Sequence, residues 1–245
     1  MFRPVAAAIV ASLAAVIPAA AAEITVMCPP PMRSLMVDLA GRFEQASGHK
    51  ITLVFAPSKD IVTRLAGGSR TDVALLTAEA SDGLIGTGTL ARRVDIVRSI
   101  IGIGVRAGAP KPDVGSADAF RRTLLAARSF ARNEGADSGV YMKSLIERLG
   151  IAEQMAPKTT LVTSGYVAAL VAKGEVELAA QQVSELMSVA GVDVTPLGAD
   201  IQHVIVFSAA VAAQPAAPEA TEALIRFLTS PAAAPVIRAK GLEPA

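Results

Sequence analysis

Short apolar runs alternate with amphipathic segments from residue 23 almost to the end of the chain, and this alternation restricts the possible folds more than any other feature. Residues 23–28, 50–56 and 71–77 have the composition of strands. Between the first two, Leu35, Leu39 and Phe43 recur every fourth residue, and Gly48 follows where a helix would end. Repeated strand–helix units favour a mostly parallel sheet with helices on both faces, so we predict an α/β protein.

The second half of the chain repeats the alternation. After an apolar strand at 98–108 and a Pro- and Gly-containing loop, Ser116 is placed to cap a helix over 117–127. Further strands are predicted at 128–133, 158–163, 176–182 and 192–198, with helices at 138–149, 165–174 and 183–191. A strand at 203–213 is long enough to return to the first unit, and 218–244 holds two closing helices. We predict two lobes joined by a hinge with two crossings, with lobe I formed by 23–104 plus 206–245 and lobe II by 105–205.

The first 22 residues have the three parts of a secretory signal peptide. Arg3 precedes an apolar run, and small residues lead up to Glu23. We therefore expect export to the periplasm with cleavage before Glu23. Without Arg3 the chain has 22 Lys and Arg against 22 Asp and Glu, and it has neither a basic run nor many aromatic residues. This composition gives no support to nucleic-acid binding.

The sequence contains no motif for binding a metal or a cofactor. Cys28 is the single cysteine and the chain has two histidines, so no disulfide or zinc cluster can be assembled from these residues. We read Cys28 as a small buried residue at a strand end. We predict no metal and no cofactor.

In such a fold the carboxyl ends of the strands and the helix N-termini face one crevice. The turn after the first predicted strand carries Pro31, Met32 and Arg33, and the turn after the second carries Ser58 and Lys59. A cation in the first turn of an exposed helix opposes the helix dipole by about 0.3–1 kcal/mol. Arg33 and Lys59 are therefore well placed only if an anion lies between them; otherwise they are solvated side chains that point away.

Two later turns complete the predicted crevice. Ser138 and Gly139 lie at the start of one helix, and Gly165 and Tyr166 at the start of another. Glycine allows a ligand to approach the backbone closely. We expect Ser58 and Ser138 to act as N-caps, which still leaves other N–H groups free for an anion. For Tyr141, packing with a tethered hydroxyl is the simpler interpretation.

Catalytic signatures are missing from the sequence. It contains no G-x-S-x-G turn, Gly-rich phosphate loop or zinc motif. His49 precedes a strand, at the opposite end of the sheet from the helix N-termini, and a structural role is the first interpretation of His203. We predict that the protein is not an enzyme.

Several stretches resemble the periplasmic solute-binding proteins of ABC importers, and among them the molybdate-binding type. They are "ITVMCPPPMRSLMVDLAGRFEQASGHKITLVFAPS", "TDVALLTAEASDGLIGTGTL", "ADSGVYMKSLIERLGI", "GYVAALVAKGEVELAAQQVSEL" and "EALIRFLTSPAAAPVIRAKGLEP". The resemblance covers nearly the whole mature chain. It implies two α/β lobes that close over a small anion and pass it to a membrane permease.

The resemblance is only partial at the oxyanion site. The family has a Ser-rich turn after the first strand, where this chain has Pro31 and Met32; Ser58 remains after the second strand, with Lys59 added. The family's tyrosine in a V-Y-x-S-D-like turn is matched by Gln182 in "QQVSE". Full charges on Arg33 and Lys59 suit a carboxylate or a larger oxoanion better than a small tetrahedral oxyanion.

We therefore predict a periplasmic, monomeric substrate-binding protein that captures a small anionic solute, a carboxylate or oxoanion, for an ABC importer. The ligand site is predicted to comprise Pro31, Met32, Arg33, Ser58, Lys59, Ser138, Gly139, Tyr166 and Gln182. A molybdate- or tungstate-binding protein is the nearest alternative, and a sensor subunit is a further one. An exported enzyme acting on an anionic substrate is the alternative from another class, with His203 as its candidate base.

Overall fold

A computed structural model describes residues 21–245. The predicted signal peptide, apart from its last two residues, lies outside this range. Within residues 21–245 no helix combines the length and the apolar character needed to cross a membrane.

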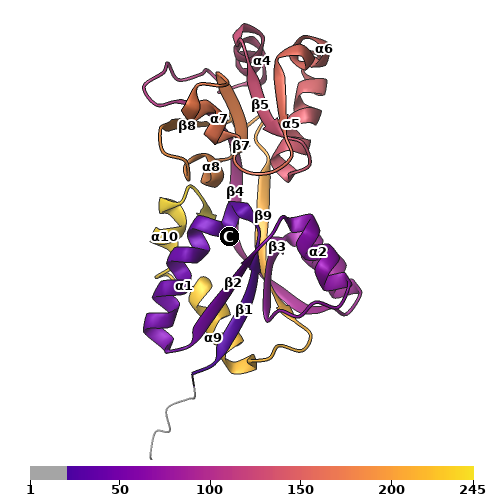
Figure 1. Cartoon of the computed structure of the whole chain (residues 1–245), viewed down its shortest axis with the longest axis vertical. Helices are drawn as coiled ribbons and strands as arrows, with labels where there is room; N and C mark the ends of the chain where they lie inside the picture. The colour runs from indigo at the N-terminus through magenta and orange to yellow at the C-terminus, as the bar shows by residue number, and fades with distance from the viewer. Residues whose placement is uncertain (1–20) are drawn as a thin grey trace, which may run out of the picture.

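The molecule consists of two bodies, which we call lobe I and lobe II, with two long strands running between them (Figure 1). Lobe I contains three parallel strands, and the antiparallel strand β9 pairs with the third of them. The strands of lobe I are β1 (Glu23–Cys28), β2 (Lys50–Phe55), β3 (Val73–Thr77), β9 (Val204–Ala212) and the short β10 (Glu243–Pro244). Its helices are the 3-10 helix η1 (Pro30–Met32), α1 (Arg33–Ser47), α2 (Ser58–Ala66), α3 (Ala78–Gly86), α9 (Pro218–Leu228) and α10 (Ala234–Ala239).

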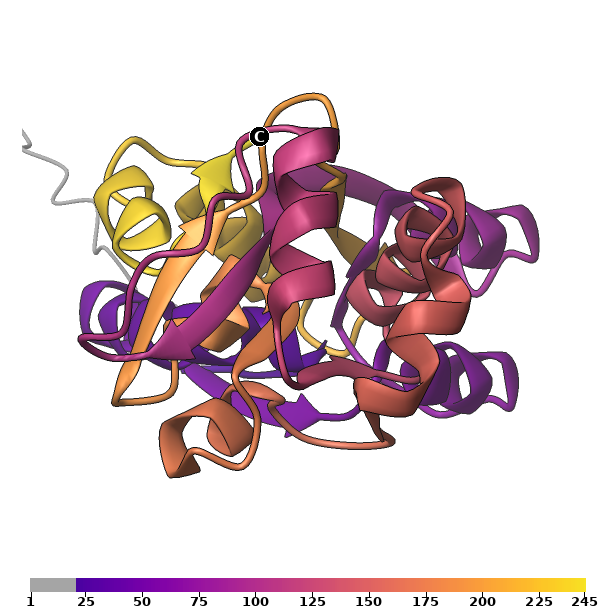
Figure 2. The same cartoon turned by 90° about the horizontal axis from the view of Figure 1, so that it is seen from above.

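Lobe II is built on three parallel strands in the order β7-β5-β6. Its strands are β5 (Phe130–Asn133), β6 (Thr159–Val162), β7 (Leu178–Gln182) and β8 (Val192–Pro196). Its helices are α4 (Ala117–Ala126), α5 (Asp137–Arg148), α6 (Ala152–Met155), the 3-10 helix η2 (Ala156–Lys158), α7 (Ala168–Lys173) and α8 (Val183–Leu186). Seen from above, these helices lie around the strands of lobe II (Figure 2). Parallel strands with intervening helices in both lobes confirm the predicted α/β class.

The sheets of the two lobes are continuous, which the sequence did not predict. Strand β4 (Leu90–Arg106) pairs with β9 over its first part and with β7 and β8 over its last part. The overall strand order is β2-β1-β3-β9-β4-β7-β5-β6. The sequence predicted this strand to begin at residue 98, so the first eight residues of β4, 90–97, were missed. Two segments, β4 and β9, thus connect the lobes, as the two-crossing hinge requires.

Each lobe has its own apolar core. Val97 and Ile205 pack in the core of lobe I, whereas Ile101 and Ile201 pack in that of lobe II. The predicted division after residues 104 and 205 stays a prediction. We propose that the chain passes from one lobe to the other a few residues earlier, near Ile100 and His203. On either side of each of these points the buried residues belong to different cores.

Helix ends follow the sequence signals in two places. Helix α1 ends at Gly48, whose φ of 76° is in the left-handed region that glycine adopts at little cost. At α4 the Ser116 hydroxyl accepts a hydrogen bond from the Ala119 N–H at 3.2 Å, as predicted for an N-cap.

Candidate functional site

The carboxyl ends of the parallel strands of the two lobes face each other. The turn after β6 contacts the turn after β1, because the Tyr166 hydroxyl donates a hydrogen bond to the Pro30 carbonyl at 3.4 Å. Helix α8, which follows β7, packs against η1. The turns that follow β1, β6 and β7 thus meet between the lobes, where the sequence predicts the crevice.

The three prolines form the 3-10 turn that leads into α1. The Met32 N–H donates to the Pro29 carbonyl at 3.0 Å. Pro30 and Pro31 occupy the first positions of this turn, where a fixed φ is favourable and an N–H would have no helical partner. Met32 is fully buried in the core of lobe I, so its side chain packs the turn against that core.

Arg33 lies at the rim of this turn. Its guanidinium carbon is 3.7 Å from the centroid of the Phe55 ring, at the end of β2. This stacking holds the cation over the turns that follow β1 and β2. The pKa of Tyr166 is raised, first by desolvation and then by Glu185, while the positive charge of Arg33 opposes the shift. Arg33 of lobe I and Tyr166 of lobe II are thus brought together.

Ser58 and Lys59 begin α2, but Ser58 is not its N-cap. The N-cap is Pro57, without a side-chain capping bond, and the first helical bond runs from the Ile61 N–H to the Pro57 carbonyl at 3.0 Å. The prediction of Ser58 as an N-cap was wrong because Pro57 already adopts the extended conformation that the position requires. The N–H groups of Ser58 and Lys59 precede the first helical bond and point out of the helix start. The Lys59 side chain is exposed.

At the start of α5 the N-cap is Ala136, so the prediction of Ser138 as an N-cap was also wrong. Ser138 is the second helical residue, fully buried. A Cβ on Gly139 would lie 2.0 Å from the Asn133 carbonyl oxygen, so only glycine allows this helix to start so close to the end of β5. The buried Arg132 guanidinium donates to the carbonyls of Asn133 and Gly139, at 3.1 and 3.2 Å, and fixes this turn.

Tyr166 does not lie inside a helix, contrary to prediction, because α7 begins only at Ala168. Tyr141 matches its predicted role: its hydroxyl donates to the Ile201 carbonyl at 2.8 Å and its ring stacks on His203, with 4.6 Å between ring centroids. His203 is therefore tied to lobe II at the crossing between the lobes.

Gln182 ends β7 and is buried, and two of its neighbours were missed by the sequence analysis. The Val167 N–H donates to Oε1 of Gln181 at 3.0 Å, and Nε2 of Gln181 donates to Oε1 of Glu185 at 3.0 Å. Glu185 is only 4% exposed. Burial raises the pKa of Glu185 from its ordinary value of 4.5 to about 8, against the opposing effect of its hydrogen bonds.

Unpartnered polar atoms gather where these residues meet. Among the described residues, eight buried side-chain oxygens have no hydrogen-bond partner. Five of them follow or end the parallel strands of lobe II: Asn133 Oδ1, Ser138 Oγ, Gln182 Oε1, Ser184 Oγ and Glu185 Oε2. Leaving such a group unpaired costs about 1–3 kcal/mol. Their concentration at one edge marks it as the place where a ligand or bound water would supply partners.

A cavity of about 530 Å³ lies between α3 of lobe I and α5 of lobe II, and none of the predicted ligand residues lines it. Thr77 and Glu79 line it from one lobe, and Asp137, Tyr141 and His203 from the other side. Desolvation raises the pKa of Asp137, which His203 opposes. This volume is large enough for a small organic acid. Glu79 and Asp137 were not singled out in the sequence, because each looks like an ordinary acidic residue in a first helical turn.

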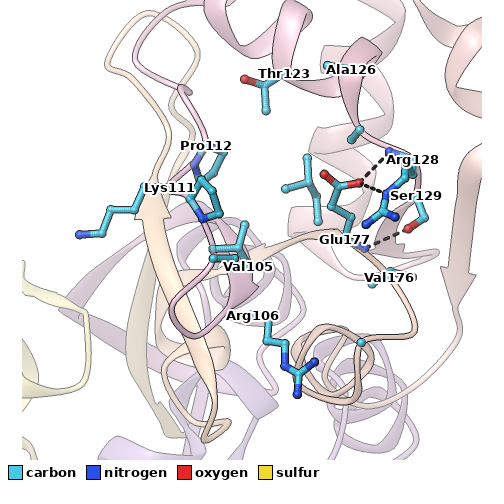
Figure 3. Close-up of a pocket in the computed structure, with 15 residues that line it drawn as sticks. Val105, Arg106, Lys111, Pro112, Thr123, Ala126, Arg128, Ser129, Val176 and Glu177 are labelled. Carbon is cyan, nitrogen blue, oxygen red and sulfur yellow. Dashed lines mark hydrogen bonds and ion pairs between the residues drawn. The ribbon is translucent and has the colours of Figure 1, made fainter.

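A larger cavity, of about 720 Å³, lies at the other end of lobe II, and its charged lining residues include Arg106, Lys111 and Arg128 (Figure 3). Arg106 and Lys111 are exposed there, while Arg128 is paired with Glu177 at 3.2 Å. None of the predicted ligand residues lines it. It is bounded by the amino ends of β5 and β7, away from the strand ends where this fold binds ligands.

No group of three or more His, Cys, Asp or Glu residues in the part of the chain that the structure describes is arranged to hold a metal ion. Cys28 is fully buried at the end of β1, as predicted, and burial raises the pKa of its thiol.

With the fold and the crevice defined, the chain can be placed among known proteins. Residues 24–243 match the family model of bacterial extracellular solute-binding proteins. The chain belongs to this family, which confirms the resemblance drawn from the sequence and supports the predicted periplasmic location.

One curated relative is considerably more similar than the solved structures. A protein of a Pseudomonas species described as an aconitate isomerase is 38% identical over 216 residues, which is 84% of this chain and 82% of that protein.

The solved structures share the fold at low identity. The substrate-binding domain of a putative molybdenum ABC transporter from Clostridium difficile has a TM-score of 0.72 at 14% identity. The match covers 92% of this chain and 100% of that domain's chain. The periplasmic molybdate-binding protein of Azotobacter vinelandii has a TM-score of 0.73 at 18% identity, covering 89% of this chain and 98% of its own. The tungstate-binding protein of Desulfovibrio alaskensis has a TM-score of 0.68 at 15% identity, covering 92% and 99%.

Proposed function

We propose that the protein captures a small polycarboxylate, an acid with two or three carboxylate groups, between its lobes in the periplasm and delivers it to the membrane permease of an ABC importer. The observation that carries this proposal is the meeting of Arg33 and Tyr166 from opposite lobes at the proline turn. A guanidinium group binds a carboxylate with two parallel hydrogen bonds, and a ligand that contacts both residues draws the lobes together.

The prolines support a carboxylate over a tetrahedral oxyanion. Pro30 and Pro31 have no N–H to offer, and the Met32 N–H is already bonded to Pro29. The turn after β1 therefore contributes Arg33 rather than the serine hydroxyls and free backbone donors of the molybdate-binding type. The curated relative agrees in ligand chemistry, because aconitate is a tricarboxylate.

Isothermal titration calorimetry of the mature protein tests the proposal. The panel comprises cis- and trans-aconitate, tricarballylate, citrate and succinate, with molybdate, tungstate and sulfate as competing oxyanions. A hydrogen bond to a charged group contributes about 1.5–3 kcal/mol, so Arg33→Gln should weaken polycarboxylate binding about 10- to 100-fold. Arg42→Gln, on the exposed side of the same helix, is the matched control and should bind normally. Tight binding of molybdate or tungstate alone would instead support the oxyanion alternative.

A second candidate function is isomerisation of an unsaturated polycarboxylate, and the 38% identity to the aconitate isomerase is the observation that favours it. Rotation about a carbon–carbon double bond requires the double bond to be lost transiently, which removal of a proton from the neighbouring CH₂ group and its return to the far carbon would achieve. Such chemistry needs an acid–base group in the crevice. His203, the candidate base from the sequence, lines the cavity between α3 and α5.

Incubation with trans-aconitate, followed by chromatographic separation of the cis and trans acids, tests this second function. If the protein is an isomerase that uses His203, His203→Gln should lose turnover and retain trans-aconitate binding. Binding by the unaltered protein without any interconversion would leave capture as its role.

A further inference from the structure

A chain of hydrogen bonds fixes the orientation of the buried Glu185 carboxyl group. The Val167 backbone N–H can only donate, so the Gln181 atom that it contacts is the side-chain carbonyl oxygen. The other end of the Gln181 amide must then be its NH₂ group, which donates to Oε1 of Glu185 at 3.0 Å. The Gln182 backbone N–H, at the start of the same helix, also lies near this carboxyl group and opposes the rise of its pKa. Oε1 is thus engaged as an acceptor while Oε2 has no partner, so a proton on this carboxyl group resides on Oε2.

Oε2 of Glu185 is buried and has no partner among the described residues. It is one of the five unpartnered oxygens at the carboxyl edge of the lobe II sheet. Helix α8, which carries it, packs against η1 of lobe I. Gly241 of lobe I also packs against α8, since a Cβ added to Gly241 would be 2.8 Å from the Val183 side chain. Both contacts are made between the lobes, so this edge is covered where they meet.

The charged groups around Glu185 do not compensate a negative charge on it. None of the ion pairs of residues 21–245 includes Glu185. Asp137, at the start of α5, raises its pKa further, and Tyr166 faces it from the turn before α7. Lys240, at the end of α10, is paired with Asp38 at 2.8 Å. Arg33 stacks on Phe55, 3.7 Å from the ring centroid, and the buried Arg132 guanidinium donates to the carbonyls of Asn133 and Gly139.

We propose that protonated Glu185 donates a hydrogen bond from Oε2 to a carboxylate of the captured ligand, with Gln181 as the residue that positions it. This inference rests on the proposed capture of a polycarboxylate and names a ligand contact that the sequence did not reveal. A neutral carboxylic acid is a strong donor to a carboxylate, whereas an ionised Glu185 would repel it.

Capture then depends on the proton of Glu185. The pKa of this group lies at about 8, and the carboxylates of the ligand ionise well below that pH. Above pH 8 each further pH unit should weaken binding by about tenfold, because a proton must be taken up for each ligand bound. Glutamine at this position reproduces the protonated form, since its oxygen can accept from Gln181 while its NH₂ group replaces the Oε2 hydroxyl.

Calorimetry with tricarballylate and trans-aconitate at pH 6, 7, 8 and 9 tests the inference, using the unaltered protein, Glu185→Gln and Glu185→Ala. Glu153→Gln, an exposed carboxyl group on α6, is the matched control. We expect Glu185→Gln to bind within a few-fold of the unaltered protein at pH 7 and to lose the decrease above pH 8. We expect Glu185→Ala to bind at least tenfold more weakly at every pH up to 8.

The results separate the inference from the proposed function. If the unaltered protein binds either acid but Glu185→Gln shows the same decrease above pH 8, the proposed contact is wrong and capture stands. If neither acid binds the unaltered protein at any pH, the proposed function and this contact are both refuted. Infrared difference spectra on ligand addition give an independent readout: the perturbed carboxylic-acid C=O band of the unaltered protein should be missing from Glu185→Gln.

Discussion

The buried carboxyl group of Glu185 should make the unfolding free energy of the ligand-free protein depend on pH. Its pKa is 4.5 in an unfolded chain and about 8 in the folded protein. The folded state therefore binds more protons than the unfolded state between these values. The stabilisation from this group is fully present below about pH 4.5 and is lost as the pH rises through about 8.

The size of the effect follows from the shift. A displacement from 4.5 to about 8 corresponds to roughly 5 kcal/mol at 1.36 kcal/mol per pKa unit. This is an upper limit, because relaxation and water entry reduce the cost of a buried charge. Glu185→Gln cannot ionise, so its stability relative to the unaltered protein should increase by a few kcal/mol between pH 5 and pH 8.

Urea unfolding at pH 5, 6, 7 and 8 measures this difference directly. The comparison between the two proteins removes the contribution of every other titrating group, and Glu153→Gln controls for the loss of one exposed carboxylate. Curves of unfolding free energy against pH that run parallel for Glu185→Gln and the unaltered protein would refute the reasoning, because they would mean that Glu185 titrates alike in both states.

Three further perturbations test the crevice and its surroundings. Gly139→Ala should destabilise the protein by at least about 1–3 kcal/mol in urea unfolding, because its Cβ would meet the Asn133 carbonyl at 2.0 Å; Gly41→Ala, with open space in the middle of α1, should instead stabilise by about 0.5–1 kcal/mol, and equal effects would contradict the geometry. Tyr166→Phe removes the hydroxyl shared between the lobes, so polycarboxylate affinity measured by calorimetry should fall about tenfold while stability changes by no more than about 1 kcal/mol. The buried Cys28 thiol should resist iodoacetamide in the folded protein and react once urea unfolds it; rapid labelling without urea would show that the end of β1 opens.

Local signals in the sequence were sufficient for most of the fold. The four-residue spacing of apolar residues in α1 and the glycine at its end need no tertiary information. The first half of β4 was missed because charged residues interrupt it. Arg93 in this half is held by ion pairs with Asp82, at 2.7 Å, and with Asp95. A strand whose exposed face carries such pairs lacks the simple apolar run that identified the other strands.

The candidate site was only partly predictable, for a physical reason. Arg33 and Tyr166 were predicted as ligand residues because both follow strand ends, where this fold gathers its ligand contacts, and their ligand role stays a prediction. The predictions that Ser58 and Ser138 are N-caps were wrong because Pro57 and Ala136 already have the extended backbone of an N-cap. Glu185 was missed because a glutamate at the start of a short helix normally faces water. Its burial depends on contacts with β7 and with the opposite lobe, which no local pattern encodes.

The two candidate functions differ in what happens to one proton. A neutral carboxylic acid that donates to a ligand carboxylate can hold a polyanion in a crevice without a second buried cation, and this suffices for capture and release. The same group becomes an acid–base catalyst only if its proton can reach a carbon atom of the ligand and return. Deuterium oxide distinguishes these cases: incorporation of deuterium into recovered trans-aconitate by the unaltered protein, but not by Glu185→Gln, would assign proton transfer to Glu185. Recovery of unlabelled ligand from a protein that binds it would show that the proton stays on the carboxyl group and serves binding alone.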